Sequence, residues 1–587
     1  MTSKQHTARL LVVLGLLLLA ACRHAPAPPA APQLPNMLVV LTDDQGWGDA
    51  AWHGNTVLET PHLNRLASQG IDMTRFYVSP VCAPTRASLL TGRYHLATGV
   101  TWVTHRKEVM RTEEQTLPEL LQPKGYTSGL FGKWHNGKQH PYHPNSQGFD
   151  TFIGFTDGHW GNYFNQTLQH NGQPMPTKGY LPDAITTHAL KFMAHTQGPW
   201  LCLVTYNTPH SPFQVPDAYF HKYKNKGLGN RLAAIYGMVE NIDYNMGRLL
   251  HYLDSTGQAQ NTVVVFLSDN GPNGHRYNGG YKGIKAAVDE GGVRVPCIIR
   301  YPAKGWAGGR KDTAMAAHID LAPTLAGLAG IAPPKNRPWH GRNLAPRLNM
   351  QASSNNRAFF THQVIRKFDS IPGAVRTNRY LLTLQNHDTA LFDVYTDPYQ
   401  KNNIKQVLPA MADSLALAYR HWFKTMTAQG IAPPPIIVGH PAQPAQQPVT
   451  LPAEEVAHRT AVAFAGQEGW AGDYLVRWQP QGSVSWAIDV LQPGAYQMLA
   501  QLSTGPAAGG YLTCATGAET ISTQVTQPYP KRQLPAPDRV PRGEMHDYAW
   551  PKVVLGTLPL QAGQQTVTLT ASGVNDLSVK SIQLIKQ

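Results

Sequence analysis

The sequence predicts an α/β protein built on a doubly wound, mainly parallel sheet, followed by a small antiparallel-sheet subdomain and then a β-sandwich. Continuous apolar runs such as Met37–Leu41 and Thr262–Ser268 are typical of buried parallel strands. Segments with helical periodicity, among them Leu232–Leu253, alternate with these runs up to about residue 330. Beyond residue 453, short alternating strands with Gly/Pro turns replace the helices, which indicates a sandwich.

Composition and charge bound the class of the protein. With 587 residues, of which 42% are hydrophobic and 15% charged, the chain is too long for one ordinary domain and is globular rather than disordered. Lysine and arginine number 50 against 36 acids, and the net charge of +14 favours anionic partners. The sequence has no Lys/Arg-dense helix or nucleic-acid-binding fingerprint, so we expect no nucleic-acid partner. A basic surface without a binding role is the alternative.

The first residues have the pattern of an export signal. A basic start precedes the apolar run Leu10–Leu19, which is too short to span a membrane comfortably. Leu19-Ala20-Ala21-Cys22 resembles a bacterial lipobox, which predicts a lipoprotein signal peptide over 1–21, a lipidated Cys22 and an Ala/Pro-rich tether over 22–35. We therefore expect an exported bacterial lipoprotein, in the periplasm or at the outer membrane or cell surface, that meets the membrane only through its lipid. A plain secretory signal is the alternative.

A short helix is predicted to begin at Cys82 and to end at Gly92. Pro84 suits the first turn of such a helix, and glycine suits its C-terminal end. Cys82 then lies at a helix N-terminus, where free N–H groups and the helix dipole favour an anion. Arg86 projects from the same face one turn later and adds a fixed cation. This pair indicates chemistry on a tetrahedral oxyanion such as sulfate or phosphate, with an inert buried thiol as the alternative.

Acidic and amide side chains follow two of the predicted strands. Asp43 and Asp44 come shortly after the first strand, and Asp269 and Asn270 come directly after Thr262–Ser268. Adjacent carboxylates repel each other unless a cation lies between them. Oxygen ligands of this kind suit Ca²⁺ or Mg²⁺, and the four together resemble a calcium site. The alternative for Asp43 and Asp44 alone is a solvated turn.

Basic side chains follow two further predicted strands. Lys133 and His135 come after the strand that ends near Phe131, and His210 lies in a loop made rigid by prolines on both sides. A doubly wound sheet binds its ligands outside the carboxyl ends of its strands. We therefore expect these basic groups to converge with the carboxylates, although isolated exposed basic residues are common.

Five motifs together resemble one known family. Cys82-Ala83-Pro84-Thr85-Arg86, followed by Leu90-Thr91-Gly92-Arg93, is similar to the signature of the type I, arylsulfatase-like sulfatases of the alkaline phosphatase superfamily. The other matching motifs are Gly132-Lys133-Trp134-His135, Pro209-His210, Ser268-Asp269-Asn270-Gly271 and Glu290-Gly291-Gly292. The resemblance runs from Asp43 to Pro296 and implies an alkaline phosphatase-like catalytic domain over 36–350.

The resemblance implies a modified nucleophile and a metal ion. In this family the cysteine at the place of Cys82 is converted by a maturase to Cα-formylglycine, whose hydrate attacks sulfur. The family's metal ligands map onto Asp43, Asp44, Asp269, Asn270 and the modified residue 82, with Ca²⁺ as the ion. Asp269 is additionally implied as the base that takes a proton from the hydrate.

Further roles follow from the same resemblance. Lys133 and Arg86 are implied to bind the sulfate, and His135 to contact the formylglycine and later to act as a base. His210 is implied as the acid for the leaving alcohol. Lys285 lies at the position where the family has a second substrate lysine, and Lys282 does not lie there. The residues that flank Lys285 depart from the usual pattern of the family. Glu290 and Arg294 are interpreted as a structural pair.

The C-terminal half divides into three predicted regions. Short strands and a helix over 351–430 resemble the smaller subdomain of sulfatases, and the Pro/Ala/Gln-rich stretch 431–453 is interpreted as a linker. The sandwich over 454–587 contains motifs, such as Gly482–Trp486, that resemble galactose-binding-like carbohydrate-binding modules. Trp470, Trp478 and Trp550 are candidates to stack on sugar or to fill the core.

The predicted function is hydrolysis of a sulfate ester on a sulfated polysaccharide or glycosaminoglycan. His159 and Trp160 lie in loop-like sequence between family motifs and are predicted to bind the sugar, with ordinary loop packing as the alternative. A phosphodiesterase or phosphonate hydrolase of the same superfamily is the second enzymatic reading. An exported glycan-binding protein with an inactive enzyme domain is the third.

The remaining cysteines do not suggest a zinc site, because no Cys/His spacing of that kind occurs. Cys202 and Cys297 both lie in apolar runs typical of strands. In an oxidising compartment they can form a disulfide, and two separate buried thiols are the equal alternative.

Overall fold

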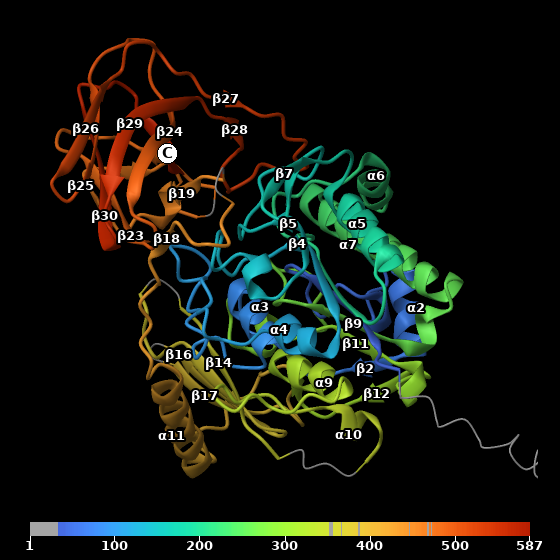
Figure 1. Ribbon diagram of the computed structural model, residues 1–587. Coiled ribbons are helices and arrows are strands. Elements are labelled where there is room, and N and C mark those ends of the chain that lie inside the picture. Colours follow the sequence, from blue (N-terminus) through green and yellow to red (C-terminus); the bar gives the residue numbers. More distant parts are fainter. Residues whose placement is uncertain are drawn as a thin grey trace, which may run out of the picture.

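The computed structural model describes residues 33–351, 356–364, 367–385, 388–444, 447–466, 469–470 and 472–587. The predicted signal peptide, Cys22 and nearly all of the tether lie outside these residues. Among the described residues, no helix combines the length and the apolar character needed to cross a bilayer. A large α/β body carries a small sheet on one side and a sandwich, coloured orange to red, on another (Figure 1).

The central sheet has ten strands in the order β12-β2-β11-β9-β1-β8-β4-β5-β6-β7. Its middle strands, from β9 to β5, run parallel, as the apolar runs predicted. Antiparallel neighbours lie toward both edges, so the sheet is mainly rather than wholly parallel. The strands span Asn36–Thr42 (β1), Ile71–Met73 (β2), Thr127–Lys133 (β4), Thr151–Phe155 (β5), Thr167–His170 (β6), Gln173–Pro176 (β7), Trp200–Thr205 (β8), Thr262–Ser268 (β9), Cys297–Arg300 (β11) and Arg310–Asp312 (β12).

The register of the three central strands brings their carboxyl ends level. Leu41 at the end of β1 pairs with Thr205, the last residue of β8. Thr42 pairs with Ser268, the last residue of β9. The loops that carry the predicted metal ligands and the predicted acid therefore leave the sheet at one edge, side by side.

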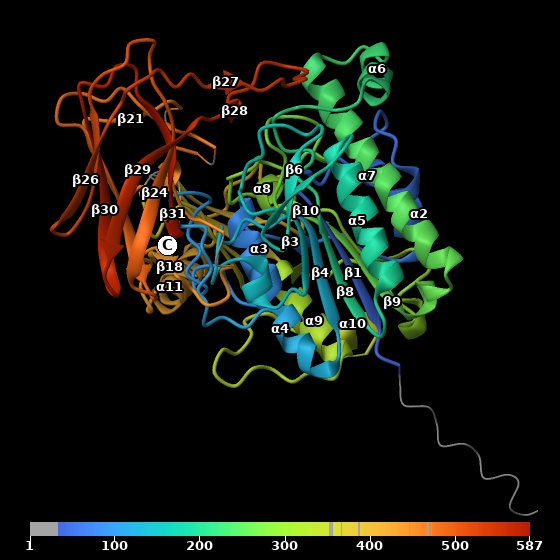
Figure 2. The same ribbon diagram turned by 45° about the horizontal axis from the view of Figure 1, so that its top comes forward.

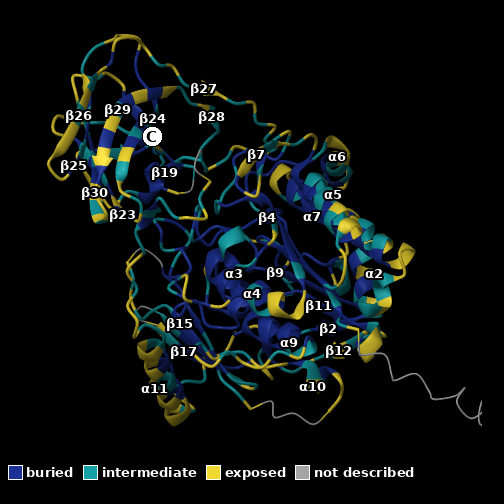
Figure 3. Cartoon of the chain, viewed as in Figure 1, coloured by how far each residue is buried: buried dark blue, intermediate teal, exposed yellow. Residues whose placement is uncertain are grey.

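Helices cover both faces of the sheet, as a doubly wound fold requires. Alternate residues of β1 belong to opposite cores: Val39 lies in the cluster that contains Ala83 and Leu325, whereas Val40 lies in the one that contains Ile185 and Leu249. In Figure 3 the strands of the central sheet are mostly dark blue, which marks buried residues. The exposed residues, in yellow, lie on the outer sides of the helices. The first core contains α3 (Cys82–Thr91), α4 (Leu117–Leu121), α9 (Leu321–Leu328) and α10 (Ala345–Leu348), and the second contains α2 (Pro61–Gln69), α5 (Leu181–His195), α6 (Asp217–Asn225) and α7 (Asn230–Ser255).

The apolar run Val295–Tyr301 forms two strands rather than one. β10 (Arg294–Val295) lies in a small separate sheet, and β11 lies in the central sheet. Pro296 lies between them and has no N–H to donate to a ladder. The break lets the chain leave one sheet and enter the other.

The small subdomain contains the predicted antiparallel sheet and helix. The sheet order is β14 (Phe359–His362), β15 (Gly373–Arg376), β16 (Tyr380–Gln385) and β17 (Asp388–Asp393). The helix α11 (Pro409–Met426) packs on this sheet, with Trp422 stacked on Phe360 at 5.1 Å between ring centroids. Most of its other faces are exposed (Figure 3).

The C-terminal sandwich has two mainly antiparallel sheets around Trp486, which is fully buried. The stretch 431–453 was predicted as a linker, and that prediction is wrong for much of its length. It supplies one strand to each sheet, because Ile436, Val438, Val449 and Leu451 within its Pro/Gln-rich sequence are buried. The main strands are β18 (Ile436–Val438), β19 (Val449–Pro452), β23 (Ser483–Val490), β24 (Gly494–Ser503), β25 (Tyr511–Thr516), β26 (Glu519–Gln524), β29 (Lys552–Leu560), β30 (Gly563–Ser572) and β31 (Ser578–Lys586).

A long segment leaves the sandwich and reaches the catalytic domain. It lies between two short paired strands, β27 (Arg532–Gln533) and β28 (Tyr548–Ala549). Both ribbon views show it extending toward α6 and α7 (Figures 1 and 2). We call residues 534–547 the arm.

The order of strands in the central sheet shows that Cys202 and Cys297 do not form a disulfide. Cys202 lies on β8 and Cys297 on β11, and both β1 and β9 lie between those strands. Neighbouring strands are about 4.8 Å apart, so the two thiols are too distant to bond. Both are free and buried.

Candidate active site

The predicted nucleophile begins helix α3. Val81 precedes the helix in extended conformation, and Gly92 ends it with a φ of 67°, the left-handed conformation that favours glycine. Cys82 is buried, and this burial raises the pKa of its thiol although Lys133 and Lys285 lie nearby. The unmodified thiol is therefore held protonated, which is a poor state for direct nucleophilic attack.

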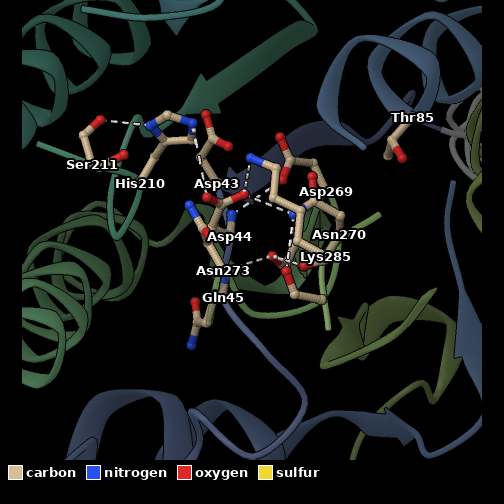
Figure 4. A network of polar contacts seen from close by, with 12 residues as sticks. Asp43, Asp44, Gln45, Thr85, His210, Ser211, Asp269, Asn270, Asn273 and Lys285 are labelled. Atoms are coloured by element: carbon tan, nitrogen blue, oxygen red, sulfur yellow. Dashed lines mark hydrogen bonds and ion pairs between the residues drawn. The ribbon is translucent and has the colours of Figure 1, made fainter. Parts of the chain in front are cut away.

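The four predicted metal ligands lie together at the strand ends. The backbone N–H of Asp44 donates to Asp269 Oδ1 at 3.2 Å, and Asn270 Nδ2 donates to Asp44 Oδ1 at 2.7 Å. Asp44 has a φ of 69°, an unusual conformation for a residue with a side chain. Figure 4 shows these side chains gathered around one space. The turns after β1 and β9 thus position each other directly.

Two lysines neutralise the paired carboxylates. Lys133 Nζ lies 2.5 Å from Asp43 Oδ2, and Lys285 Nζ lies 2.6 Å from Asp44 Oδ1. Burial alone would raise the pKa of both carboxyl groups, but these ammonium groups outweigh it and lower the pKa of Asp43 and of Asp44. Both carboxylates are therefore ionised at neutral pH.

Arg86 links helix α3 to the ends of three strands, β1, β4 and β9. Its guanidinium donates to Asp269 Oδ2 at 2.9 and 3.2 Å and to the Lys133 carbonyl at 2.9 Å, and it lies 3.6 Å from Asp43 Oδ2. Burial, followed by the charge of Asp43, raises the pKa of Asp269 to about 7. The helix N-terminus, the acids and the cations thus form one compact group.

The donor set fits a hard divalent ion. Asp43 Oδ1, Asp44 Oδ2 and Asn270 Oδ1 are buried, and none of them has a hydrogen-bond partner in the described chain. Ligand atoms of Asp43, Cys82 and Asp269 all lie within 4.8 Å of one another. Such oxygen-rich groups are what Ca²⁺ prefers, and a cation would satisfy the three orphaned oxygens.

The two predicted catalytic histidines have different partners. His210 Nδ1 is 2.6 Å from the Ser211 carbonyl, which makes it the donor and leaves Nε2 facing Asp44 Oδ2 at 3.8 Å. His135 Nε2 is 2.9 Å from the Val103 carbonyl, and its buried Nδ1 has no partner among the residues described. Burial lowers the pKa of His135 well below its usual value, so it is a neutral ring with one free acceptor nitrogen.

The predicted sugar-binding residues are close to the site but differ in environment. The His159 ring lies 6.0 Å from that of His210, between centroids. Trp160 instead stacks on Phe155 at 4.7 Å and packs against the core. Their binding roles remain predictions.

Several contacts at the site were not predicted from the sequence. Arg276 pairs with the buried Asp49 at 2.6 Å and donates to the Asp44 carbonyl, which supports the metal-site turn. The Val103 carbonyl and the Ser211–Glu544 contact come from loops with no motif. Asp49 follows β1 closely, so its position near the strand ends could have been predicted from the sequence. No local pattern indicates the contact of His135 with Val103 or that of Ser211 with Glu544. Glu290 pairs with Arg294 as interpreted, and also with Arg376.

Comparison with known proteins identifies the family. Residues 35–331 match the family described as Sulfatase, and residues 284–416 match the one described as N-sulphoglucosamine sulphohydrolase, C-terminal. The chain belongs to the sulfatase family. It is a type I sulfatase of the alkaline phosphatase-like superfamily, an enzyme that hydrolyses sulfate esters. The sandwich lies beyond both matched regions, and its likeness to galactose-binding modules remains a prediction.

Named relatives agree with this assignment. The sulfatase is 33% identical over 379 residues to the N-acetylgalactosamine-6-sulfatase of Canis lupus familiaris, covering 58% of this chain and 69% of the relative. It is 30% identical over 437 residues to the steryl-sulfatase of Mus musculus, covering 59% and 70%. The structure of Ps i-CgsB in complex with k-i-k-neocarrahexaose superposes with a TM-score of 0.62 at 27% identity, covering 67% of this chain and 93% of that one.

Proposed function

We propose that this sulfatase removes sulfate from a sulfated glycan, using a formylglycine formed from Cys82 and a Ca²⁺ ion held by Asp43, Asp44, Asp269 and Asn270. The observation that supports this most is the Cys82 sulfur within 4.8 Å of the Asp43 and Asp269 oxygens. Lysine and arginine groups lie around the same point. When present, the hydrated aldehyde supplies a nucleophilic hydroxyl and the ion a Lewis acid for sulfate oxygens.

The cations of the site have an electrostatic role in this proposal. Arg86, Lys133 and Lys285 are held by carboxylates before substrate arrives, so they need little reorganisation. They neutralise charge on the sulfuryl oxygens as the ester bond lengthens. Lys285 is half-buried, whereas Arg86 and Lys133 are buried, so Lys285 is the cation that faces the entering ester.

The histidines have different proton roles. His210 directs Nε2 into the site and is positioned to protonate the leaving alcohol oxygen. His135 presents a neutral, unpartnered Nδ1 and is positioned to accept a proton when the sulfate is released from the enzyme. Asp269, fixed by Arg86, is the base for the attacking hydroxyl.

A glycan substrate is supported by four observations. A relative 33% identical is named N-acetylgalactosamine-6-sulfatase, and a solved structure 27% identical is a complex with k-i-k-neocarrahexaose. The chain carries a net charge of +14, which favours polyanions. His159 lies beside His210 with both ring nitrogens buried and without partners among the described residues. Lipidation of Cys22 and modification by a maturase remain predictions from the sequence.

The test joins a chemical and a kinetic measurement. Mass spectrometry of protein made in its native host should show formylglycine in place of Cys82, and the matured enzyme should hydrolyse sulfate esters faster than matched phosphate diesters. Cys82→Ser should abolish turnover, whereas Cys514→Ser, at a buried thiol of the sandwich, should not. An unmodified Cys82 in active enzyme would contradict the proposal.

Calcium is tested separately through stability. Ca²⁺ added to chelator-treated Cys82→Ser protein should raise the melting temperature by several degrees, because a ligand at about a hundred times its Kd contributes roughly 2.7 kcal/mol. Asp44→Asn should remove most of that shift. Equal melting curves with and without Ca²⁺ would exclude this metal site.

A further inference from the structure

The arm fixes the sandwich to the catalytic domain at the rim of the active site. Its Arg539 donates a backbone hydrogen bond to the Phe213 carbonyl at 3.0 Å and a guanidinium hydrogen bond to the Val215 carbonyl at 2.7 Å. The same guanidinium packs over the Phe220 ring at 4.7 Å. These contacts lie on the segment that follows His210, so the arm packs on the loop that carries the predicted acid.

A second group of contacts holds the middle of the arm. Arg542 pairs with Asp538 at 2.6 Å and donates to the Gly161 carbonyl at 2.7 Å. Asp538 also accepts from Gln214 Nε2 at 2.7 Å. Gly161 is packed so closely on the arm that a Cβ there would lie 2.3 Å from an Asp547 oxygen. The arm is thus built into the loops around His159 and His210.

Glu544 connects the arm to His210 through Ser211. Its Oε1 accepts a hydrogen bond from the Ser211 hydroxyl, and the Ser211 carbonyl accepts from His210 Nδ1 at 2.6 Å. Glu544 is half-buried and forms no ion pair with any described residue. A carboxylate offers about four acceptor positions, so one hydrogen bond leaves most of its capacity open.

Two histidines, one on the arm and one beside His210, have buried ring nitrogens without partners among the residues described. Both ring nitrogens of His159 and Nδ1 of His546 are buried, and they have no hydrogen-bond partner in the described part of the chain. His159 also packs against Gly472 of the sandwich. Buried polar groups without partners cost free energy, so their presence at one rim indicates a polar ligand that satisfies them. Residues of both domains contribute to this rim.

We propose that the arm completes the subsite for the leaving group, and that Glu544 accepts hydrogen bonds from hydroxyls of the sugar whose sulfate is cleaved. The proposal rests on the proposed glycan sulfatase function. An unpaired carboxylate attracts hydroxyl donors and repels a second anion, so the subsite selects a hydroxyl-bearing face of the sugar. The sandwich is then part of the active site and determines specificity.

The experiment compares two substrates of the matured, full-length enzyme. For Glu544→Ala, kcat/KM on N-acetylgalactosamine 6-sulfate or neocarrahexaose, whichever the wild type hydrolyses faster, should fall at least tenfold. The same variant should keep its kcat/KM on 4-nitrophenyl sulfate within twofold, because that small ester presents no hydroxyls to the arm. Glu519→Ala, at an exposed acid on another face of the sandwich, is the control and should change neither.

Other outcomes overturn the proposal. Equal losses on both substrates would mean that Glu544 acts only through Ser211 and His210, and no loss on either would exclude a contact with sugar. If Glu544→Ala has a lower melting temperature than the wild type, Glu544→Gln, which keeps the shape of the side chain, replaces it. Glu544→Gln should lose kcat/KM on the saccharide but not on 4-nitrophenyl sulfate, by a smaller factor.

A binding measurement separates this subsite from the chemistry. In the full-length Cys82→Ala background, calorimetry with the same two saccharides should show at least tenfold weaker binding after Glu544→Ala. That loss of binding would support the subsite even if the matured wild-type enzyme hydrolysed no sulfate ester. Absence of hydrolysis would contradict the proposed function but not the subsite. Unchanged binding would exclude the subsite.

Discussion

Lys285 Nζ lies 2.6 Å from Asp44 Oδ1, and this ion pair joins the loop after β9 to the turn after β1. Asp44 is buried and has a left-handed backbone conformation, so it depends on its neighbours for position. Lys285 reaches it from a loop whose sequence departs from the usual family pattern. The contact therefore distinguishes Lys285 from the nearby Lys282, whose Nζ lies 3.6 Å from Asp289 and away from the metal site.

Lys285→Ala should lower kcat/KM for a sulfate ester by about a hundredfold, because loss of one preorganised charge at a reacting oxyanion typically costs that much or more. Lys282→Ala is the matched control, since that side chain is 48% exposed, and it should stay within about threefold of wild type. Steady-state kinetics decide the matter. Equal effects of the two variants would remove Lys285 from the site.

Gly158→Ala should displace His135. A Cβ at this position would lie 2.0 Å from His135 Nε2, the atom that contacts the Val103 carbonyl. We expect kcat to fall at least tenfold while the melting temperature changes little, because the clash is confined to a loop. Gly229→Ala, where a Cβ meets nothing within 4 Å, should leave both unchanged. Full activity of Gly158→Ala would show that this His135 position is not needed.

Arg376→Ala should destabilise the junction between the small subdomain and the catalytic domain. Arg376 Nε lies 3.0 Å from Glu290 Oε1, and both side chains are 1% exposed. Removing Arg376 leaves the buried Glu290 carboxylate with only the more distant Arg294, at 3.4 Å. We therefore expect a cost of about 3 kcal/mol, the lower end of the range for breaking a buried pair. Denaturant unfolding measures the change.

Arg379→Ala is the control for that variant, because Arg379 pairs with Asp393 at the surface and is 62% exposed. Its unfolding midpoint should match that of the wild type. If Arg376→Ala unfolds at the same denaturant concentration as the control, the pair contributes nothing to the junction.

Asp243→Asn should change the pH dependence of stability. Asp243 caps α2 by accepting backbone hydrogen bonds from His62 and Leu63, and its burial raises the pKa of the carboxyl to about 7. The unfolded value is about 4, so the folded state binds the proton more tightly and loses stability as pH rises from about 4 to 7. The melting temperature of Asp243→Asn relative to wild type should therefore be a few degrees higher at pH 8 than at pH 5.

Asp254→Asn is the control for the pH experiment, because Asp254 lies on α7 as Asp243 does. Asp254 pairs with Arg65 near the surface, where solvent screens the charge. Its melting temperature relative to wild type should not depend on pH between 5 and 8. A parallel response of the two variants would mean that Asp243 does not carry the effect.

Local sequence determined the elements and the chemistry of the site. Apolar runs located β1 and β9, and Pro84 and Gly92 bounded the helix at Cys82, because such signals act over a few residues. The polar groups after those strands could be assigned to one edge, since parallel strands share the end at which ligands bind. The fold class was predicted correctly on this basis, and the family was predicted correctly from the resemblance of the motifs between Asp43 and Pro296.

Only the tertiary structure decided how distant segments meet. It divided the apolar run at Pro296, placed strands inside the expected linker, and separated Cys202 from Cys297 by two strands. It also brought Glu544 to Ser211, more than three hundred residues earlier. Such contacts have no local signature, because the free energy that holds them comes from the packing of whole domains rather than from neighbouring residues in the chain.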